Sequence, residues 1–141
     1  MFSIQHSSEV ATAADEIAPA GTALDLYSGV GVFAGVLAAR GWSVTAVESN
    51  PSAVDDARSN LRTLDVSSVR ADVHSWKPPR ADLVVADPSR AGLEKRGVYV
   101  AAASRARRVI LISCDAASLG RDTELLRREG YKLSYATPVD L

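Results

Sequence analysis

The sequence has one cysteine, no long apolar run and almost no net charge, and each of these shortages excludes a class of protein. With Cys114 alone among its 141 residues, the chain can form neither an internal disulfide nor a cysteine-only metal cage. No apolar stretch approaches the roughly 20 residues that span a bilayer. The N-terminus carries no basic segment followed by an apolar core, as a secretory signal would. We therefore expect a cytoplasmic protein with no membrane contact and no metal site.

Charge of one sign is also scarce. The formal net charge is −1, from 16 basic and 17 acidic residues, so the molecule as a whole has no field that attracts nucleic acid. Only local basic clusters could contact RNA. What the chain does contain is 47% hydrophobic residues, enough for the core of one ordinary domain. We expect a single domain over residues 1–141, with a lead-in helix within residues 1–21 and an α/β core over residues 22–141.

Strand and helix patterns alternate along the chain. Strands are predicted over residues 22–26, 42–47, 66–71, 82–86, 108–113 and 131–137. Helices are predicted from Ser7 or Ser8 to Pro19, from Phe33 to Ala39, from Pro51 to about Thr63, from Val98 to Ala106 and from Ser118 to Glu129, with Gly130 as a left-handed cap. This β-α alternation without repeats predicts a mostly parallel sheet between helical layers, a Rossmann-like fold.

The segment Asp25-Leu-Tyr-Ser-Gly-Val-Gly31 joins the first strand to the first core helix. Its glycines, Gly29 and Gly31, permit a tight turn with positive φ and let a ligand approach bare backbone at the helix N-terminus. Glu48 ends the next strand, where a carboxylate can accept hydrogen bonds from ribose hydroxyls. The pair indicates an adenosine cofactor, either S-adenosylmethionine or NAD. Asp25 favours the cationic S-adenosylmethionine, because an acid inside the turn would repel a diphosphate.

Polar residues also follow the third and fourth strands. Asp72 follows the third strand, either near an adenine amino group or as an ordinary surface acid. The segment Asp87-Pro-Ser-Arg-Ala-Gly92 follows the fourth strand, and it is either a plain turn or part of a binding site. In a site, Asp87 would accept a hydrogen bond from a ring N–H, and Arg90 would donate to a phosphate or carbonyl oxygen.

Cys114 follows the fifth strand and comes directly before a predicted helix. A lone cysteine is more often an inert core residue, but a helix N-terminus favours the thiolate, and the position faces the same crevice as Asp87. We therefore interpret Cys114 as a nucleophile. The isolated His6 and His74 are expected to have ordinary surface or packing roles.

Together these motifs resemble those of the RNA 5-methyluridine methyltransferase family, which acts on uracil in tRNA or ribosomal RNA. The matching segments, in order, are Phe2-Ser-Ile-Gln5, Asp25–Gly31, Val47-Glu48, Asp87–Gly92 and Ser113-Cys-Asp115. The resemblance implies a three-layer class I methyltransferase fold. It also implies that S-adenosylmethionine is bound by Gln5, Tyr27, Gly29, Gly31, Glu48, Asp72 and Asp87. The chain departs from the family pattern at Ser28, Ser89 and Asp115, where a cysteine, a proline and an asparagine are common.

The family chemistry assigns roles to the residues after the fourth and fifth strands. The Cys114 thiolate adds to C6 of uracil, and C5 becomes an enolate carbon that attacks the methyl sulfonium. A base then removes the C5 proton and the thiolate leaves. Asp87 would hydrogen-bond the extruded uracil, and Arg90 would stabilise developing oxygen charge. The family's RNA-binding barrel, general-base glutamate and last strand have no counterpart in residues 1–141, so we expect a fragment of a longer enzyme.

Three other functions stay open at this point. The chain could methylate another base or a small molecule, with Cys114 merely structural. It could be a catalytically silent module that binds S-adenosylmethionine or RNA. A nicotinamide oxidoreductase is the third alternative, because the glycine turn and Glu48 also fit NAD. The sequence does not indicate an oligomeric state.

Overall fold

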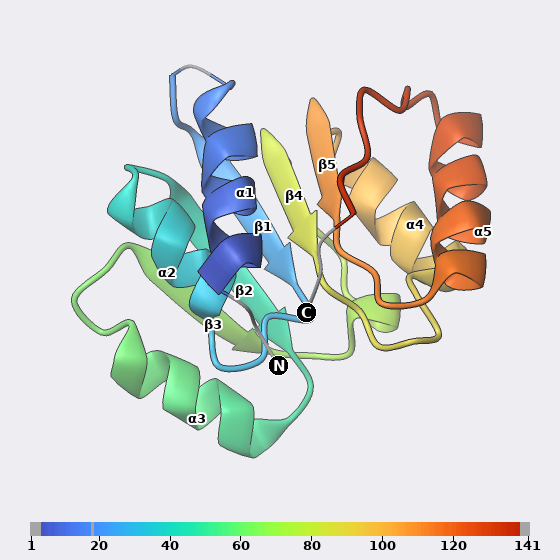
Figure 1. Ribbon diagram of the computed structural model, residues 1–141. Coiled ribbons are helices and arrows are strands. Elements are labelled where there is room, and N and C mark those ends of the chain that lie inside the picture. Colours follow the sequence, from blue (N-terminus) through green and yellow to red (C-terminus); the bar gives the residue numbers. More distant parts are fainter. Residues whose placement is uncertain (1–3, 18, 139–141) are drawn as a thin grey trace.

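Five strands form one parallel sheet in the computed structural model, which describes residues 4–17 and 19–138, with the backbone alone for residues 4–7 (Figure 1). In chain order the elements are α1 (Ile4–Asp15), β1 (Thr22–Leu26), α2 (Val32–Ala39), β2 (Ser43–Glu48), α3 (Pro51–Asn60), β3 (Val66–Arg70), the short 3₁₀-helix η1 (Val73–Ser75), β4 (Leu83–Ala86), α4 (Glu94–Ala103), β5 (Arg108–Leu111) and α5 (Ala116–Arg128). The strands lie in the order β3-β2-β1-β4-β5. Because the chain passes from β3 back to β4, the winding reverses between β1 and β4, where open α/β sheets bind ligands.

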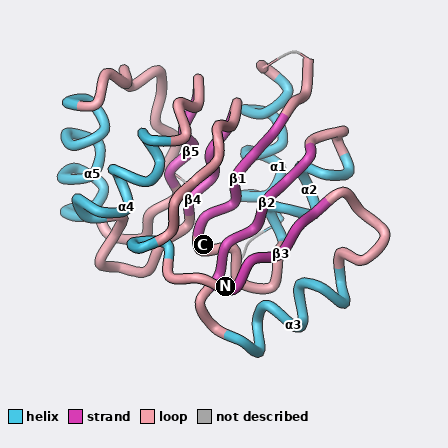
Figure 2. Tube along the Cα trace, turned by 180° about the vertical axis from the view of Figure 1, so that it is seen from behind, coloured by secondary structure: helices cyan, strands magenta, loops and turns pink. Residues whose placement is uncertain are grey.

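Helices cover both faces of the sheet (Figures 1 and 2). Successive side chains of a strand point to opposite faces, so Ala23 and Leu83 pack in one buried cluster and Leu24 and Val84 in the other. The first cluster is completed by α1, α2 and α3, and the second by η1, α4 and α5. The strand cores are therefore buried on both sides, as expected for a parallel sheet.

The predicted α/β architecture with a parallel sheet is confirmed. Five of the predicted strands form within two residues of their expected bounds. Gly130, with φ of 99°, ends α5 in the left-handed conformation that was expected there. Among the described helices, none is long and apolar enough to cross a membrane.

Three helices begin two or more residues earlier than predicted. In α1 the first described residue, Ile4, is already helical, and the Ser8 carbonyl accepts a hydrogen bond from the Thr12 hydroxyl inside the helix. In α5 the cap is Asp115, whose carboxylate accepts the Ser118 N–H at 2.8 Å, so that Ser118 lies in the first turn. Aspartate is a good N-cap residue, so the side chain of Asp115 explains the earlier start of α5.

The third helix, α4, begins at Glu94 and not at Val98. Its N-terminal N–H groups are capped by the carboxylate of Asp122, which belongs to α5 and lies 28 positions beyond Glu94. The residues next to Glu94 in the sequence give no signal of such a cap. The loop after β4 is therefore shorter than predicted, and Gly97 is a buried helical residue.

The predicted strand over residues 131–137 is wrong. The segment 131–138 is described but forms no strand. Tyr131 is fixed by its hydroxyl, which donates to the Ala106 carbonyl at 2.8 Å, but Leu133 and Tyr135 are 69% and 54% exposed. A strand needs a hydrogen-bonded neighbour and a buried face, and this segment has neither.

Candidate functional site

The carboxyl ends of the strands bring most of the predicted site residues to one edge of the sheet. Because all the strands are parallel, the residues that follow them meet at this edge. Those residues are Asp25 and Tyr27 on β1 and just after it, Glu48 at the end of β2, Asp72 after β3, Asp87 and Arg90 after β4, and Cys114 after β5. The predicted assembly of these positions is thus observed. Gln5 lies in the first turn of α1, and its side chain is outside the described part of the structure.

The glycine turn has the expected left-handed backbone. Gly29 has φ of 55° and Gly31 has φ of 92°. A Cβ on Gly31 would lie 2.5 Å from Cδ1 of Leu61, so this glycine is needed to let α2 approach the end of α3. A Cβ on Gly29 would meet nothing within 4 Å. Gly29 therefore borders open space, and its lack of a side chain leaves the backbone accessible to a ligand.

Glu48 is tied directly to this turn. One carboxylate oxygen accepts the Gly29 N–H at 3.0 Å, and the other accepts the Asn50 N–H at 2.8 Å. A carboxylate has about four lone-pair sites, so two acceptor positions are still available to ribose hydroxyls. The half-buried side chain is held in place before any ligand arrives.

Asp25 lies beneath the turn and not on its surface. Its side chain is fully buried, and Oδ2 accepts the Ala34 N–H of α2 at 3.0 Å. The other oxygen, Oδ1, is buried without a hydrogen-bond partner among the described residues. Burial raises the pKa of Asp25 to about 8, against the lowering effect of the Ala34 bond, and the Asp87 and Glu48 charges add to the rise. The carboxyl is therefore largely protonated near neutral pH.

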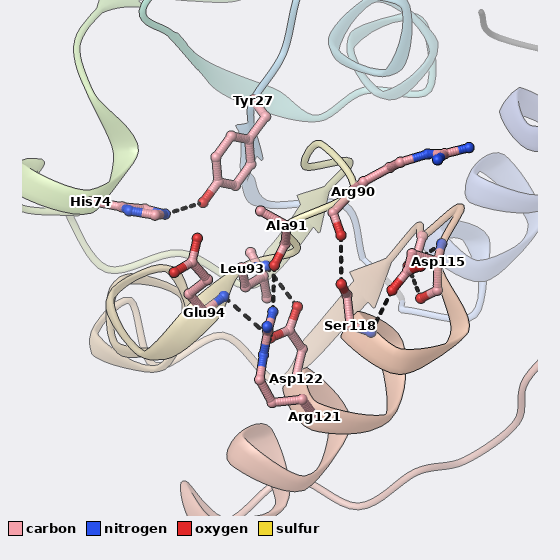
Figure 3. Close-up of polar contacts among 11 residues, drawn as sticks. Tyr27, His74, Arg90, Ala91, Leu93, Glu94, Asp115, Ser118, Arg121 and Asp122 are labelled. Carbon is pink, nitrogen blue, oxygen red and sulfur yellow. Dashed lines mark hydrogen bonds and ion pairs between the residues drawn. The ribbon is translucent and has the colours of Figure 1, made fainter.

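Tyr27 connects the turn to η1. Its backbone has a positive φ of 58°, which is rare for a bulky residue, and its hydroxyl lies 2.9 Å from Nε2 of His74 (Figure 3). Burial, and then the Asp72 charge, raises the pKa of the Tyr27 phenol, so the hydroxyl stays protonated. His74, for which the sequence indicates an ordinary surface or packing role, packs edge-on against the Tyr27 ring.

Asp72 caps η1 and stays exposed. One of its carboxylate oxygens accepts the His74 N–H at 3.0 Å. The residue thus has a local structural role at the position where an adenine contact is predicted. Both interpretations of Asp72 given by the sequence are compatible with this placement.

The loop after β4 is fastened to one face of α5 by side chains that we call the α5 clamp: Ser118, Arg121 and Asp122 (Figure 3). Ser118 Oγ donates to the Arg90 carbonyl at 2.5 Å, and the Arg121 guanidinium donates to the Ala91 carbonyl. The Asp122 carboxylate accepts the N–H groups of Leu93 at 2.6 Å and of Glu94 at 3.2 Å. Sequence reasoning missed the clamp. A signal was present, because the i, i+4, i+8 spacing of Ser118, Asp122 and Leu126 places an acid on the buried face of a helix.

The side chains expected to contact the acceptor lie near this clamp. Asp87 is half-buried at the end of β4, and Arg90 is exposed, with its guanidinium pointing away from the clamp (Figure 3). Cys114 is an exposed free thiol between β5 and the N-cap of α5. The Ile112 N–H donates to the Ala86 carbonyl at 2.9 Å, so the two strand ends run side by side just before Asp87 and Cys114.

The residues present fit S-adenosylmethionine better than a dinucleotide. The edge carries the carboxylates of Glu48, Asp72 and Asp87 above the buried Asp25. This concentration of acids attracts a ligand with a sulfonium and an ammonium group and repels a diphosphate. The open backbone at Gly29 and the remaining acceptor sites on Glu48 suit a nucleoside.

Residues 23–110 match the family described as Methyltransferase domain, and this chain belongs to that family. In the crystal structure of Pyrococcus abyssi tRNA (uracil-54, C5)-methyltransferase in complex with S-adenosyl-L-homocysteine, the similar part has a TM-score of 0.75 and 30% identity. It covers 86% of this chain and 31% of that one. These findings confirm the class I methyltransferase fold and S-adenosylmethionine as the cofactor of the class.

Curated relatives are named RNA methyltransferases. Uncharacterized RNA methyltransferases of Streptomyces coelicolor and Streptomyces avermitilis are 40% and 39% identical to this chain over 127 residues. The matches cover 84% of this chain and 28% and 29% of those proteins, respectively. The chain therefore spans less than a third of the length of these relatives.

Proposed function

We propose that this chain is the cofactor-binding catalytic domain of an RNA methyltransferase that methylates C5 of a uridine in tRNA or ribosomal RNA. The observation that carries the proposal is the exposed thiol of Cys114, which follows β5 beside the strand end that leads into Asp87 and Arg90. A nucleophile and a polar loop on neighbouring strand ends, next to a methyl-donor site, suit addition to a pyrimidine ring. The RNA methyltransferase names of the relatives support the substrate class.

The donor side would hold the cofactor without large rearrangement. We assign the ribose hydroxyls to Glu48, the nucleoside contact to the bare backbone at Gly29, and the methionine end to the surface near Tyr27. Asp25 would act from below the turn, because its buried carboxyl adds negative charge there when it ionises. Gln5 and Asp72 are proposed as further contacts on the evidence of the family motif alone.

The acceptor side would carry out the addition. The Cys114 thiolate adds to C6 of uracil, and the displaced π electrons make C5 nucleophilic. Bound S-adenosylmethionine would supply the methyl group that C5 takes up and would be released as S-adenosylhomocysteine. A base then removes the C5 proton, and the C6–S bond breaks to restore the thiolate. Asp87 and Arg90 would hold the polar edge of uracil and its developing negative oxygen.

A basic groove next to this edge offers a route for the RNA backbone. It is lined by His74, Glu94, Lys95, Arg96, Arg121 and Leu125. The local excess of cations in this groove contrasts with the net charge of −1 of the whole chain. Such a cluster suits phosphate contacts, which position RNA without specifying the base.

The test is covalent trapping with RNA that contains 5-fluorouridine, in the presence of S-adenosylmethionine. Fluorine at C5 cannot be removed as a proton, so the covalent adduct accumulates after methyl transfer. Its formation needs only the thiolate and the methyl donor. We expect an adduct at Cys114 that is lost in Cys114→Ala, with calorimetric binding of S-adenosylmethionine unchanged.

Binding of S-adenosylmethionine without any adduct would contradict the uracil-C5 assignment and leave a methyltransferase for another acceptor, or a silent binding module. Failure to bind S-adenosylmethionine would overturn the proposal as a whole. Matched titrations with NAD, for which we expect no binding, check the cofactor choice.

A further inference from the structure

The β4–α4 loop supplies no capping side chain for the start of α4. Leu93 is the N-cap of α4 but supplies no capping side chain, and it lies in helical conformation. The first N–H groups of a helix need acceptors, and here the acceptor is the carboxylate of Asp122. The start of α4, and with it the end of the loop, is therefore determined by α5.

Asp122 is suited to this role and to few others. Its side chain is 1% exposed, and a buried carboxylate is tolerated only when it is paired and hydrogen-bonded. It accepts two backbone N–H groups at the positive end of the α4 dipole and contacts the Arg121 guanidinium at 3.0 Å. Gly92 makes the approach possible, because a Cβ there would lie 2.3 Å from Oδ2 of Asp122.

Ser118 extends the connection to the nucleophile. Its backbone N–H donates to the carboxylate of Asp115, the residue after Cys114, and its hydroxyl donates to the carbonyl of Arg90. One residue thus joins the segment that carries the thiol to the loop that carries the guanidinium. The second joint, through Asp122, is one helical turn further along α5.

We propose that the α5 clamp is a positioning device for the acceptor: Ser118, Arg121 and Asp122 hold the loop of Asp87–Gly92 and the Cys114 segment as one rigid body. The rigidity would serve uracil binding and attack by the thiolate, and for this purpose the inference rests on the proposed function. The clamp touches neither the glycine turn nor Glu48, so its loss leaves cofactor binding intact.

Hydrogen exchange on the 141-residue chain tests the clamp directly. The asparagine side chain in Asp122→Asn can accept only on its oxygen. We therefore expect the backbone N–H groups of Leu93 and Glu94 to exchange about tenfold faster, as for the loss of roughly one hydrogen bond. The amides of Gly29 and Ala34 should keep their wild-type rates. Glu124→Gln is the matched control, a carboxylate-to-amide change on α5 that lies outside the clamp, and it should change none of these rates.

A fluorine label on Cys114, the only cysteine, provides a spectroscopic readout that does not depend on activity. We expect one sharp ¹⁹F resonance in the wild type and in Glu124→Gln, and a broadened or split resonance in Asp122→Asn. The milder Ser118→Ala should broaden it too, and it guards against a variant that does not fold. A single sharp line in both clamp variants, or equally faster exchange throughout the sheet, would overturn the proposal in favour of a purely structural role.

Trapping with unlabelled protein links the clamp to chemistry. Where the wild type forms the 5-fluorouridine adduct, Asp122→Asn should form it about tenfold more slowly while the dissociation constant of S-adenosylmethionine stays the same. A wild-type rate would overturn the positioning role. An absence of adduct in the wild type refutes the proposed function instead, and the clamp is then decided by exchange and the ¹⁹F spectrum.

Discussion

The cofactor edge, made by the glycine turn and Glu48, and the acceptor edge, made by the β4–α4 loop and Cys114, are stabilised in different ways. At the cofactor edge the bonds to Glu48 and Asp25 join residues 2 to 19 positions apart. At the acceptor edge the clamp joins residues 28 to 30 positions apart. The first is built into a continuous motif, whereas the second exists only after α5 has packed against α4.

The two edges are therefore sensitive to substitutions at different places in the chain. A substitution in the glycine turn acts on the backbone that forms the cofactor site itself. We expect a substitution in the clamp to act on the acceptor edge from a remote helix and to leave the cofactor site unchanged. Variants that change fold stability and ligand binding separately test this difference between the two edges.

Among substitutions compared at one pH, the largest loss of stability is expected in the glycine turn. In Gly31→Ala the added methyl group is strained by the left-handed backbone and clashes with Leu61. Together these effects should lower the free energy of unfolding by about 3 kcal/mol. Gly29→Ala, the matched variant, faces open space and should lose only about 1 kcal/mol. Its Cβ, however, lies where the ligand approaches, so binding of S-adenosylmethionine should weaken strongly.

Urea unfolding and calorimetry on the two variants give the comparison. Equal stability losses would mean that Leu61 moves aside at little cost. Normal cofactor binding by Gly29→Ala would remove the turn from the binding site.

The next effect is a pH dependence caused by Asp25. Its pKa is about 8 in the folded chain and 3.8 in the unfolded reference, so the folded state holds an extra proton between these values. Stability should therefore fall as pH rises through this window, by at most about 1.4 kcal/mol per pH unit. Urea unfolding at several pH values should show that Asp25→Asn lacks this slope, whereas Asp55→Asn on the exposed side of α3 keeps it. Equal slopes in all three proteins would show that the Asp25 carboxyl ionises without penalty.

The same contrast explains what could be predicted from the sequence. The sheet, the turn and the Glu48 position follow from periodicity and from residues close in the chain, and they are confirmed. The start of α4 depends on Asp122 and the surroundings of His74 depend on Tyr27, contacts between residues 28 and 47 positions apart. The predicted strand over residues 131–137 had a suitable pattern, but a pattern cannot supply the neighbour that a strand pairs with.

The smallest effect is expected at Tyr27, which reaches from the cofactor edge toward α4. A Cβ on Gly97 of α4 would lie 2.9 Å from the Tyr27 hydroxyl, and that hydroxyl bonds His74. Tyr27→Phe should lower the free energy of unfolding by about 1 kcal/mol through the lost bond, whereas Tyr99→Phe, at a position 69% exposed, should be neutral.

Hydrogen exchange in the same variant decides whether the two edges are held independently. If the clamp alone fixes the start of α4, the Leu93 and Glu94 amides will exchange at wild-type rates in Tyr27→Phe, even where η1 exchanges faster. Faster exchange at Leu93 would mean that the cofactor edge also supports the acceptor loop, through the packing of Tyr27 on Gly97. The cofactor edge and the acceptor edge would then be formed by separate sets of contacts, but the rigidity of the acceptor edge would depend on both sets.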